Sequence, residues 1–265
     1  MYTIPFTKMH GLGNDFIVIN QLENKIDIKK LPIKRLADRL LGIGCDQLLI
    51  IEPSTRADFF CRIYNANGQE ASQCGNGLRC IARYLYEEKL HPKKQLAIET
   101  IAGVYPAEIL DFDHIRINMG KPTIQTDGID FKTHQATYIE IGNPHLIIKV
   151  DNINTIPIDA WLMQIANQSD LKDKVNVGFM QIIDSHHIRL RTIERGAGET
   201  AACGSNACAA AIAGIMHHQL KDTIVVIYPL GNLIIKWQKE NQTLTQTGPA
   251  TSVFSGKINL DHWHK

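Results

Sequence analysis

Short apolar segments separated by polar turns run along this chain and predict a fold made largely of strands. Helices are predicted where apolar side chains recur at helical spacing, at Leu31–Leu41 and Ile158–Asn167, with Pro32 and Pro157 near their starts, where proline is tolerated. The predicted strands and β-rich segments are Phe16–Asn20, Gln47–Glu52, Phe59–Tyr64, Leu96–Ile109, Ile115–Asn118, His145–Val150, Val177–Ile183, His187–Ile193, Ile224–Tyr228, Leu233–Gln238 and Leu244–Thr247.

The same succession of elements occurs twice, which indicates an internal repeat. A shift of 129 positions, without a gap, superposes a set of unusual residues of the first half on the second. These pairs are Gly13-Asn14 with Gly142-Asn143, Gln47 with Asn176, Arg62 with Arg191, Asn65 with Glu194, Glu70 with Glu199, and Cys74-Gly75 with Cys203-Gly204. A second helix is predicted after each Cys-Gly, continuing to Glu88 in the first half and to His217 in the second.

The repeat predicts a mixed α/β (α+β) fold of two pseudo-symmetric domains. Turns rich in Gly and Pro, at Met119–Pro122 and Thr247–Pro249, mark the same place in each copy. We therefore expect residues 1–118, with a closing strand from 249–265, to form one domain and residues 119–248 the other. Because ligand sites favour domain interfaces, we expect the active site in a cleft between the two domains.

Composition narrows the classes of function. The net charge of +1 gives no field that would favour nucleic acid or an anionic membrane. The apolar runs are far too short to cross a bilayer, and Met1–His10 lacks the apolar core of a signal peptide. We expect a cytoplasmic protein that acts on a small molecule, with no nucleic-acid or membrane partner.

Two of the six cysteines, Cys74 and Cys203, are candidates for chemistry. An intracellular chain of this size does not need disulfides, and the cysteine spacing is not that of a zinc site, so no metal is expected. A lone cysteine is more often a buried packing residue, and this interpretation is applied to the other four, which are Cys45, Cys61, Cys80 and Cys208. Cys74 and Cys203 differ because both precede glycine, both open a predicted helix and both fall at the same offset in the repeat.

A cysteine at a helix N-terminus has a lowered pKa and lies beside free backbone N–H groups that bind anions. Inverting the α-carbon of an amino acid requires one group to remove the proton and a second to return one on the opposite face. Two such cysteines suit this task. The N–H groups near Gly75-Asn76 and Gly204-Ser205 can stabilise the negative charge that spreads into the substrate carboxylate. This scheme requires no cofactor.

Several segments together make the chain resemble the diaminopimelate epimerase family along nearly its whole length. They are KMHGLGNDF (8–16), GIGCDQLL (42–49), YNANGQEASQCGNGLRC (64–80), IGNPH (141–145), NVGFMQ (176–181) and ERGAGETAACGSNACAA (194–210). The resemblance implies a cofactor-independent isomerase that interconverts L,L- and meso-2,6-diaminopimelate for lysine and peptidoglycan synthesis. It also implies a homodimer, and domains in which a mostly antiparallel sheet wraps around a central helix.

The same resemblance assigns roles to residues. Cys74 and Cys203 match the catalytic pair, the first removing the proton of the L,L isomer and the second returning one. His145 and Glu194 match residues that tune the cysteine pKa values. Positions that match substrate contacts are Asn14, Gln47, Asn65, Gly75, Asn76, Asn143, Asn176, Glu194, Arg195, Gly204 and Ser205. The chain departs from the family at Asn206, where glycine is usual, at Cys45, and at Phe254, where a tyrosine is linked to dimer contacts.

Three alternatives fit parts of the pattern. The first is a proline racemase or hydroxyproline epimerase of the same fold, although such a substrate has no second charged end for Arg195 and its neighbouring amides to bind. The second is a thiol hydrolase or transferase whose cysteine is oriented by His10 or His145, which leaves the second cysteine unexplained. The third is a metal- or redox-sensing module in which the cysteines pair.

Overall fold

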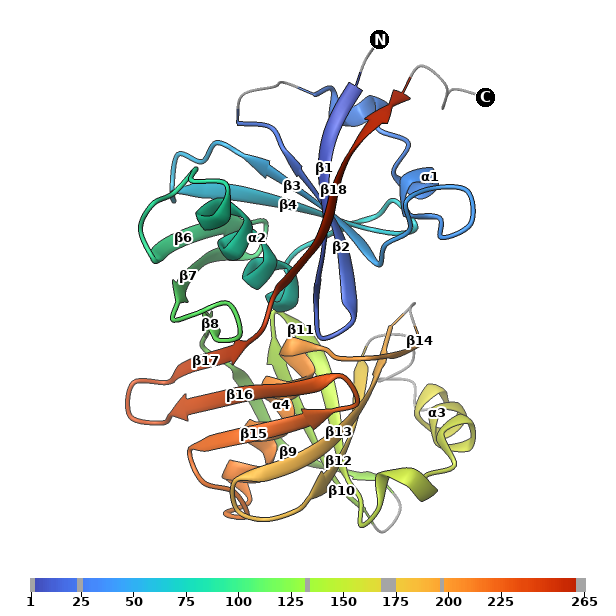
Figure 1. The fold of residues 1–265 in the computed structure, drawn as a ribbon. Coiled ribbons are helices and arrows are strands. Elements are labelled where there is room, and N and C mark those ends of the chain that lie inside the picture. Colours follow the sequence, from blue (N-terminus) through green and yellow to red (C-terminus); the bar gives the residue numbers. More distant parts are fainter. Residues whose placement is uncertain (1–2, 23–25, 132–133, 168–174, 196–197, 261–265) are drawn as a thin grey trace. The chain divides into compact units, whose positions relative to one another are not determined.

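The computed structural model describes residues 3–22, 26–131, 134–167, 175–195 and 198–260. The chain forms two compact units, the first of Met1–Ile117 with Gly248–Lys265 and the second of Asn118–Thr247. The ribbon in Figure 1 follows the chain through both. No helix in the described ranges has the length and apolar character needed to span a membrane.

The first unit is a sheet in which most neighbouring strands are antiparallel. Strands β2 and β3, and β4 and β6, are the parallel neighbours, and β18 pairs antiparallel with β1. Its elements are β1 (Thr3–Gly11), β2 (Asn14–Asn20), η1 (Ile28–Lys30), α1 (Ile33–Ala37), β3 (Gln47–Glu52), β4 (Phe59–Asn65), β5 (Glu70–Ala71), α2 (Gly75–Glu87), β6 (Gln95–Thr100), β7 (Gly103–Ile109), β8 (Ile115–Gly120) and β18 (Thr251–Asn259).

The second unit repeats this arrangement. Strands β11 and β12, and β13 and β15, are its parallel neighbours, and the remaining neighbours are antiparallel. Its elements are β9 (Thr123–Phe131), β10 (His134–Ile141), β11 (Asn143–Lys149), η2 (Ile153–Thr155), α3 (Ile158–Ala166), β12 (Asn176–Ile182), β13 (His187–Glu194), β14 (Gly198–Thr200), α4 (Gly204–Met216), β15 (Thr223–Tyr228), β16 (Gly231–Gln238) and β17 (Thr243–Gly248).

The predicted repeat is confirmed down to the register of its strands. In the first unit Phe16 pairs with Gln47 across the parallel strands, and in the second unit His145 pairs with Asn176 at the equivalent position. The short strands that lead to the cysteines also agree, because Tyr64 opposes Glu70 as Ile193 opposes Glu199. The predicted fold class, a mixed α+β fold of two pseudo-symmetric parts, is therefore correct.

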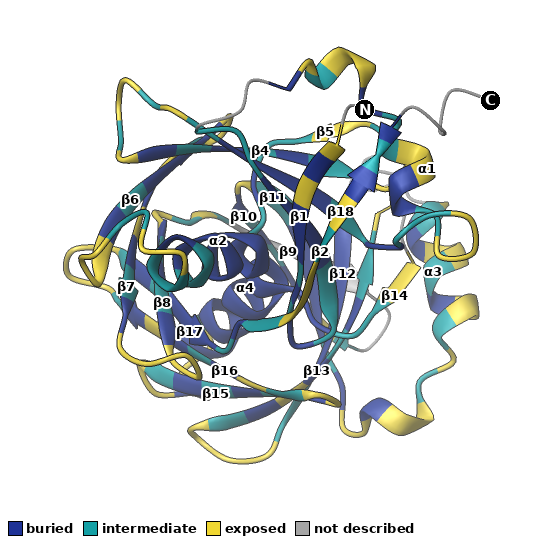
Figure 2. Ribbon diagram, turned by 45° about the horizontal axis from the view of Figure 1, so that its top comes forward, coloured by how far each residue is buried: buried dark blue, intermediate teal, exposed yellow. Residues whose placement is uncertain are grey.

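Each sheet packs around one buried helix. Helix α2 contacts β1 and β7, and α4 contacts β10, β11 and β16. Figure 2 shows α4 and the first turns of α2 in the colour of buried residues. Helix α4 is rich in alanine and is buried from Gly204 to Ile215, because small side chains let strands approach its backbone closely. The start of each helix, where its cysteine lies, is thereby held by the surrounding sheet.

Three details of the local structure differ from the prediction. The helix predicted at Leu31–Leu41 ends at Ala37, because the Asp38 carboxylate accepts hydrogen bonds from the backbone N–H groups of Leu40 and Leu41 (2.8 and 2.7 Å) and turns the chain. The segment Leu96–Ile109 is split into β6 and β7 by a turn that ends at Gly103. Strands β1, β5, β9, β10 and β14 were not predicted.

Candidate active site

Cys74 caps the N-terminus of α2. Its backbone is extended (φ −151°, ψ 108°), and its Sγ accepts a hydrogen bond from the Gly77 backbone N–H at 3.4 Å. The thiol is half-buried, whereas Cys45, Cys61, Cys80 and Cys208 are buried, as expected of packing residues. A helix N-terminus offers unsatisfied N–H groups and partial positive charge. The sulfur of Cys74 therefore lies where a thiolate and a bound carboxylate are both stabilised.

An asparagine side chain lies beside this sulfur. Cys74 Sγ is 3.7 Å from Asn14 Oδ1, and Asn76 Nδ2 donates to the same oxygen at 3.2 Å. Asn14 begins β2 after a turn in which Gly13 takes a left-handed backbone conformation (φ 84°), which glycine adopts without strain. The turn places Asn14 at the end of the hairpin, next to the start of α2.

Gln47 and Asn65 are opposite each other on β3 and β4, and their side chains are joined. Gln47 Nε2 donates to Asn65 Oδ1 at 2.9 Å. Within the described part of the chain, Gln47 Oε1 is buried and has no hydrogen-bond partner. A buried acceptor of this kind is costly unless it is satisfied, and a substrate ammonium group is a donor that could satisfy it.

Cys203 caps α4 in the second unit, but its surroundings differ from those of Cys74. Its Sγ donates to Glu194 Oε2 at 3.3 Å and lies 3.5 Å from Ser205 Oγ. Burial raises the pKa of the Cys203 thiol well above its usual value, and the negative charge of Glu194 raises that pKa further. Glu194 is itself held by Thr200 Oγ1, which donates to its other oxygen at 2.7 Å. Cys203 is therefore held as a protonated thiol.

The backbone around Cys203 is fixed by buried polar groups. Tyr228 Oη donates to the Cys203 carbonyl at 3.0 Å. Gly204 lies against the fully buried side chain of Gln246, and a Cβ at position 204 would come within 2.3 Å of Gln246 Oε1. The absence of a side chain at Gly204 thus brings the first turn of α4 close to β17.

His145 is buried in the second unit and is neutral. Asn206 Nδ2 donates to His145 Nδ1 at 3.2 Å, so the ring proton resides on Nε2, which has no partner among the described residues. Burial lowers the pKa of His145 from 6.5 to about 3. Room for the Asn206 side chain comes from Gly178, where a Cβ would lie 2.3 Å from Asn206 Oδ1. The departure at Asn206 is thus accommodated by a defined buried position.

The remaining predicted contacts of the second unit lie at strand ends. Asn176, the first residue of β12, accepts a hydrogen bond from the Arg195 backbone N–H at 2.9 Å. The Arg195 side chain is exposed. Asn143 begins β11 after Gly142 (φ 69°), as Asn14 follows Gly13. Asparagine and arginine in these positions can bind ammonium and carboxylate groups of a zwitterion.

Known proteins are similar to this chain along nearly its whole length. The sequence model of the family described as diaminopimelate epimerase matches residues 6–125 and 137–253. The diaminopimelate epimerase of Nitrosospira multiformis is 44% identical, over 97% of this chain and 99% of that protein. The diaminopimelate epimerase of Aromatoleum aromaticum is 39% identical, over 98% of this chain and 100% of that protein. The chain belongs to the diaminopimelate epimerase family.

Solved structures of other proteins share the fold of this epimerase-family chain. A PhzF-family phenazine biosynthesis protein of Bacillus anthracis matches with a TM-score of 0.75 at 17% identity, covering 98% of this chain and 100% of that one. A hydroxyproline epimerase of Agrobacterium vitis matches with a TM-score of 0.74 at 15% identity, covering 98% and 93%. At such identities the likeness concerns the fold alone.

Within each unit of this epimerase-family chain, the structure brings together part of the predicted set. Asn14 and Asn76 lie at Cys74, and Gln47 is joined to Asn65. In the second unit, Glu194 and Ser205 lie at Cys203, whereas the ring of His145 is bonded to Asn206. Sequence reasoning missed Asp46, Arg79 and Tyr228, which hydrogen-bond to Asn14, Asn76 and the Cys203 backbone, and it noted Asn206 only as a departure from the family. One signal could have revealed Arg79, because it is a lone charge inside the apolar run 78–82 and a buried charge needs partners.

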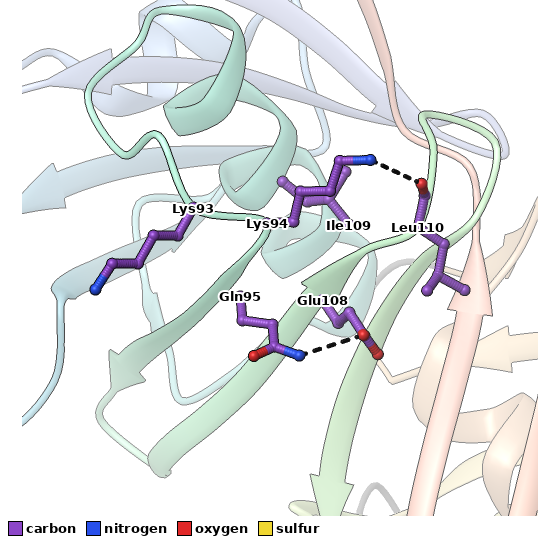
Figure 3. A pocket seen from close by; sticks show the side chains of 6 residues that line it. All are labelled: Lys93, Lys94, Gln95, Glu108, Ile109 and Leu110. Carbon is purple, nitrogen blue, oxygen red and sulfur yellow. Dashed lines mark hydrogen bonds between the residues drawn. The ribbon is translucent and has the colours of Figure 1, made fainter.

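The pocket in Figure 3 is a separate feature of the first unit. It is lined by Lys93, Lys94, Gln95, Glu108, Ile109 and Leu110. Lys94 Nζ donates to the Leu110 carbonyl and Gln95 Nε2 donates to Glu108, both at 3.4 Å. None of the predicted site residues lines this open pocket, so it does not mark the active site.

Replacing Glu194 by glutamine is expected to lower the pKa of Cys203. The negative charge that opposes ionisation of the thiol is removed, while the size of the side chain is kept. The ultraviolet absorbance of the thiolate, followed against pH in a Cys74→Ala background, measures this change. An unchanged or raised pKa in the Glu194→Gln protein would contradict the electrostatic role of Glu194.

The free energy of unfolding is expected to decrease as the pH falls below 6.5. The unfolded chain binds a proton at His145 near pH 6.5, but the folded chain binds it only near pH 3, so acid favours the unfolded state throughout that window. The expected contribution is up to roughly 1.4 kcal/mol per pH unit. Urea unfolding at several pH values measures it, and His145→Gln should flatten the dependence. Equal slopes for both proteins would contradict the assignment.

Proposed function

We propose that this chain interconverts L,L-2,6-diaminopimelate and meso-2,6-diaminopimelate without a cofactor. One of Cys74 and Cys203 removes the α-proton, and the other donates a proton to the same carbon from the opposite face. The observation that carries the proposal is the duplicated cysteine at the N-cap of a buried helix, in a chain whose relatives are named for this reaction. The reaction serves lysine and peptidoglycan precursor synthesis.

The surroundings of the two sulfurs support different roles at rest. Cys203 is kept protonated by burial and by Glu194, so it is suited to donate a proton. Cys74 is half-buried and accepts the Gly77 N–H, so it is suited to act as a thiolate base. In the L,L-to-meso direction the Cys74 thiolate takes the α-proton to become a thiol. The electron pair left on carbon spreads into the carboxylate, and the Cys203 thiol gives its proton to the opposite face. Two thiols can exchange these roles for the reverse reaction.

The charge that develops in the substrate carboxylate needs stabilisation, because an amino-acid α-proton is very weakly acidic. We assign this task to the backbone N–H groups of Gly75 and Asn76 on α2 and of Gly204 and Ser205 on α4. They are the first residues of their helices, where N–H groups lack partners within the helix. Fixed donors of this kind stabilise developing negative charge without reorganisation.

The distal end of the substrate carries a second ammonium and a second carboxylate. We propose that Arg195 binds the distal carboxylate and that the ammonium is bound by acceptors such as Gln47 Oε1. The other proposed substrate contacts are Asn14, Asn65, Asn143, Asn176 and Glu194. His145 is proposed to act on the pKa of a cysteine. The distal contacts distinguish a long double zwitterion from a substrate of proline size.

We further propose that the chain is divided into two functional halves, 1–118 with 249–265 and 119–248, each of which supplies one of the two cysteines. A homodimer is proposed as well, supported by the exposed Val253 and Phe254 on β18 (54% and 51% exposed), where a partner could cover apolar surface. A cytoplasmic location suits the chemistry, because reducing conditions keep two reactive thiols free.

Proton exchange measured by NMR tests the function. The reduced protein is incubated with L,L-diaminopimelate in D₂O, and both the α-proton signal and the appearance of the meso isomer are followed. We expect deuterium at the α-carbon together with meso product. If the folded, reduced protein gives neither, the substrate assignment is wrong, and trans-4-hydroxy-L-proline is the next substrate to try, given the fold shared with a hydroxyproline epimerase.

A further inference from the structure

A chain of hydrogen bonds between side chains passes by Cys74 in the first unit. Arg79 Nη2 donates to Asn76 Oδ1 at 2.9 Å, and Asn76 Nδ2 donates to Asn14 Oδ1 at 3.2 Å. Asn14 Nδ2 then donates to Asp46 Oδ2 at 2.9 Å, and the other oxygen of Asp46 accepts from Arg39 Nη2 at 2.8 Å. We name the chain Arg79–Asn76–Asn14–Asp46 the amide relay.

The two ends of the amide relay determine the direction of every bond within it. A guanidinium group can only donate and a carboxylate can only accept, whereas an asparagine amide presents one atom of each kind. With Arg79 at one end and Asp46 at the other, Asn76 and Asn14 each have one orientation that satisfies both neighbours. Turning either amide over would set donor against donor or acceptor against acceptor.

The anchors at both ends are firmly held. Arg79 is fully buried, and its Nε also donates to the Pro249 carbonyl at 3.1 Å. Asp46 accepts the Asp15 backbone N–H at 3.1 Å in addition to its bond from Arg39. Neither end can turn without breaking further hydrogen bonds, so the relay keeps its direction.

We propose that Asp46 and Arg79 are positioning residues that hold the oxygen, and not the nitrogen, of the Asn14 amide against the Cys74 sulfur. Cys74 Sγ is 3.7 Å from this oxygen. An acceptor in that place favours the thiol over the thiolate, and an N–H in the same place would do the opposite. The relay thus keeps Cys74 a stronger base, with a pKa nearer the working pH, than the helix N-terminus alone would give.

The sequence does not repeat the residues of the amide relay beside Cys203. The positions equivalent to Asp46, Asn76 and Arg79 in the second half are Val175, Ser205 and Cys208. There the acceptor at the cysteine is the carboxylate of Glu194. The repeated fold does not itself require the relay, which supports a role specific to Cys74.

The test measures the reactivity of Cys74 and uses no substrate. Alkylation of Cys74 by iodoacetamide is followed against pH by peptide mass spectrometry, in the wild type and in Asp46→Ala. Asp46 is chosen because its side chain is 42% exposed, whereas Arg79 is fully buried. Loss of the carboxylate leaves only the bond from Asn76 to hold the Asn14 amide, so the Asn14 oxygen is held less firmly against the sulfur. We expect the midpoint of alkylation to fall by about one pH unit, a roughly tenfold gain in rate below the midpoint.

A second comparison separates orientation from simple charge. Removing Asp46 also removes a negative charge, which by itself would lower the pKa of Cys74. In an Asn14→Ala background an effect carried by the amide disappears, while an effect of charge alone persists. The proposal is overturned if Asp46→Ala shifts the midpoint equally in both backgrounds, or in neither. Glu108→Ala, which removes the carboxylate paired with Arg116, is the matched control and should leave the profile unchanged.

The consequence for turnover rests on the function proposed above. We expect Asp46→Ala to lower kcat more than it changes KM, because a thiolate of lower pKa is a weaker base. Failure of the substrate assignment would appear in the D₂O experiment on the wild type, whereas failure of the amide relay would appear in the alkylation profiles.

Discussion

Replacing either Cys74 or Cys203 by serine is expected to reduce epimerisation by at least about 10³-fold, because a serine hydroxyl ionises far less readily than a thiol and is a poor proton donor and acceptor near neutral pH. Both variants should fold, since serine differs from cysteine by one atom at a helix N-cap, where serine is favoured. The rate of meso product formation from L,L-diaminopimelate, with circular dichroism as a check on folding, measures the effect.

Cys208→Ala is the matched control for these variants. Cys208 lies on α4, one turn beyond Cys203, and is fully buried between alanines. Its replacement should change stability more than turnover. If only one of the two serine variants loses activity, the proposal that both cysteines move protons is contradicted, and a single-nucleophile mechanism gains support.

Replacing Gly204 by alanine is expected to lower the free energy of unfolding by about 1–3 kcal/mol, the usual cost of inserting a methyl group into a filled core. The new Cβ would lie 2.3 Å from Gln246 Oε1, and Gln246 is fully buried and donates to Met119 Sδ at 2.8 Å, so it has little freedom to move. Urea unfolding monitored by tryptophan fluorescence measures the change.

The double variant Gly204→Ala with Gln246→Ala tests the cause. If the overlap with Gln246 is responsible, the double variant should be more stable than the sum of the two single changes predicts, by at least about 0.5 kcal/mol. Strict additivity would show that alanine at position 204 acts in another way, for example through the backbone conformation of the first turn.

The internal repeat made the two-part fold predictable from the sequence. Hydrophobic periodicity alone predicted only some of the helices and strands. Superposing Cys74 on Cys203 predicted two similar sheets, each with a helix after its cysteine, and both are present. Helix length was less predictable. Apolar spacing at Leu31–Leu41 suggested a helix, but a hydrogen bond from the Leu41 N–H to the Asp38 carboxylate ends it early. Local competition of this kind is not visible in hydrophobic periodicity.

The candidate site shows a similar limit. Residues that face a substrate stand in recognisable motifs, and the resemblance to a family found them. The groups that orient them come from distant places in the sequence, as when Asp46 bonds to Asn14 or Tyr228 bonds to the Cys203 carbonyl. Their side chains carry no pattern of their own, because only the folded chain brings a donor to its acceptor.

The pairing of β18 with β1 has a consequence for synthesis on the ribosome. Thr3 pairs with Asn259, so β1 cannot complete its pairing until β18 has been translated. Asn118–Thr247 is a contiguous segment and can complete its fold earlier. Until β18 emerges, one edge of β1 stays open to wrong partners. The unit that contains β1 is therefore expected to complete its fold after Asn118–Thr247, although most of it is translated earlier. A chain that stops within β18 should be impaired in the unit that contains β1, and Asn118–Thr247 should still fold.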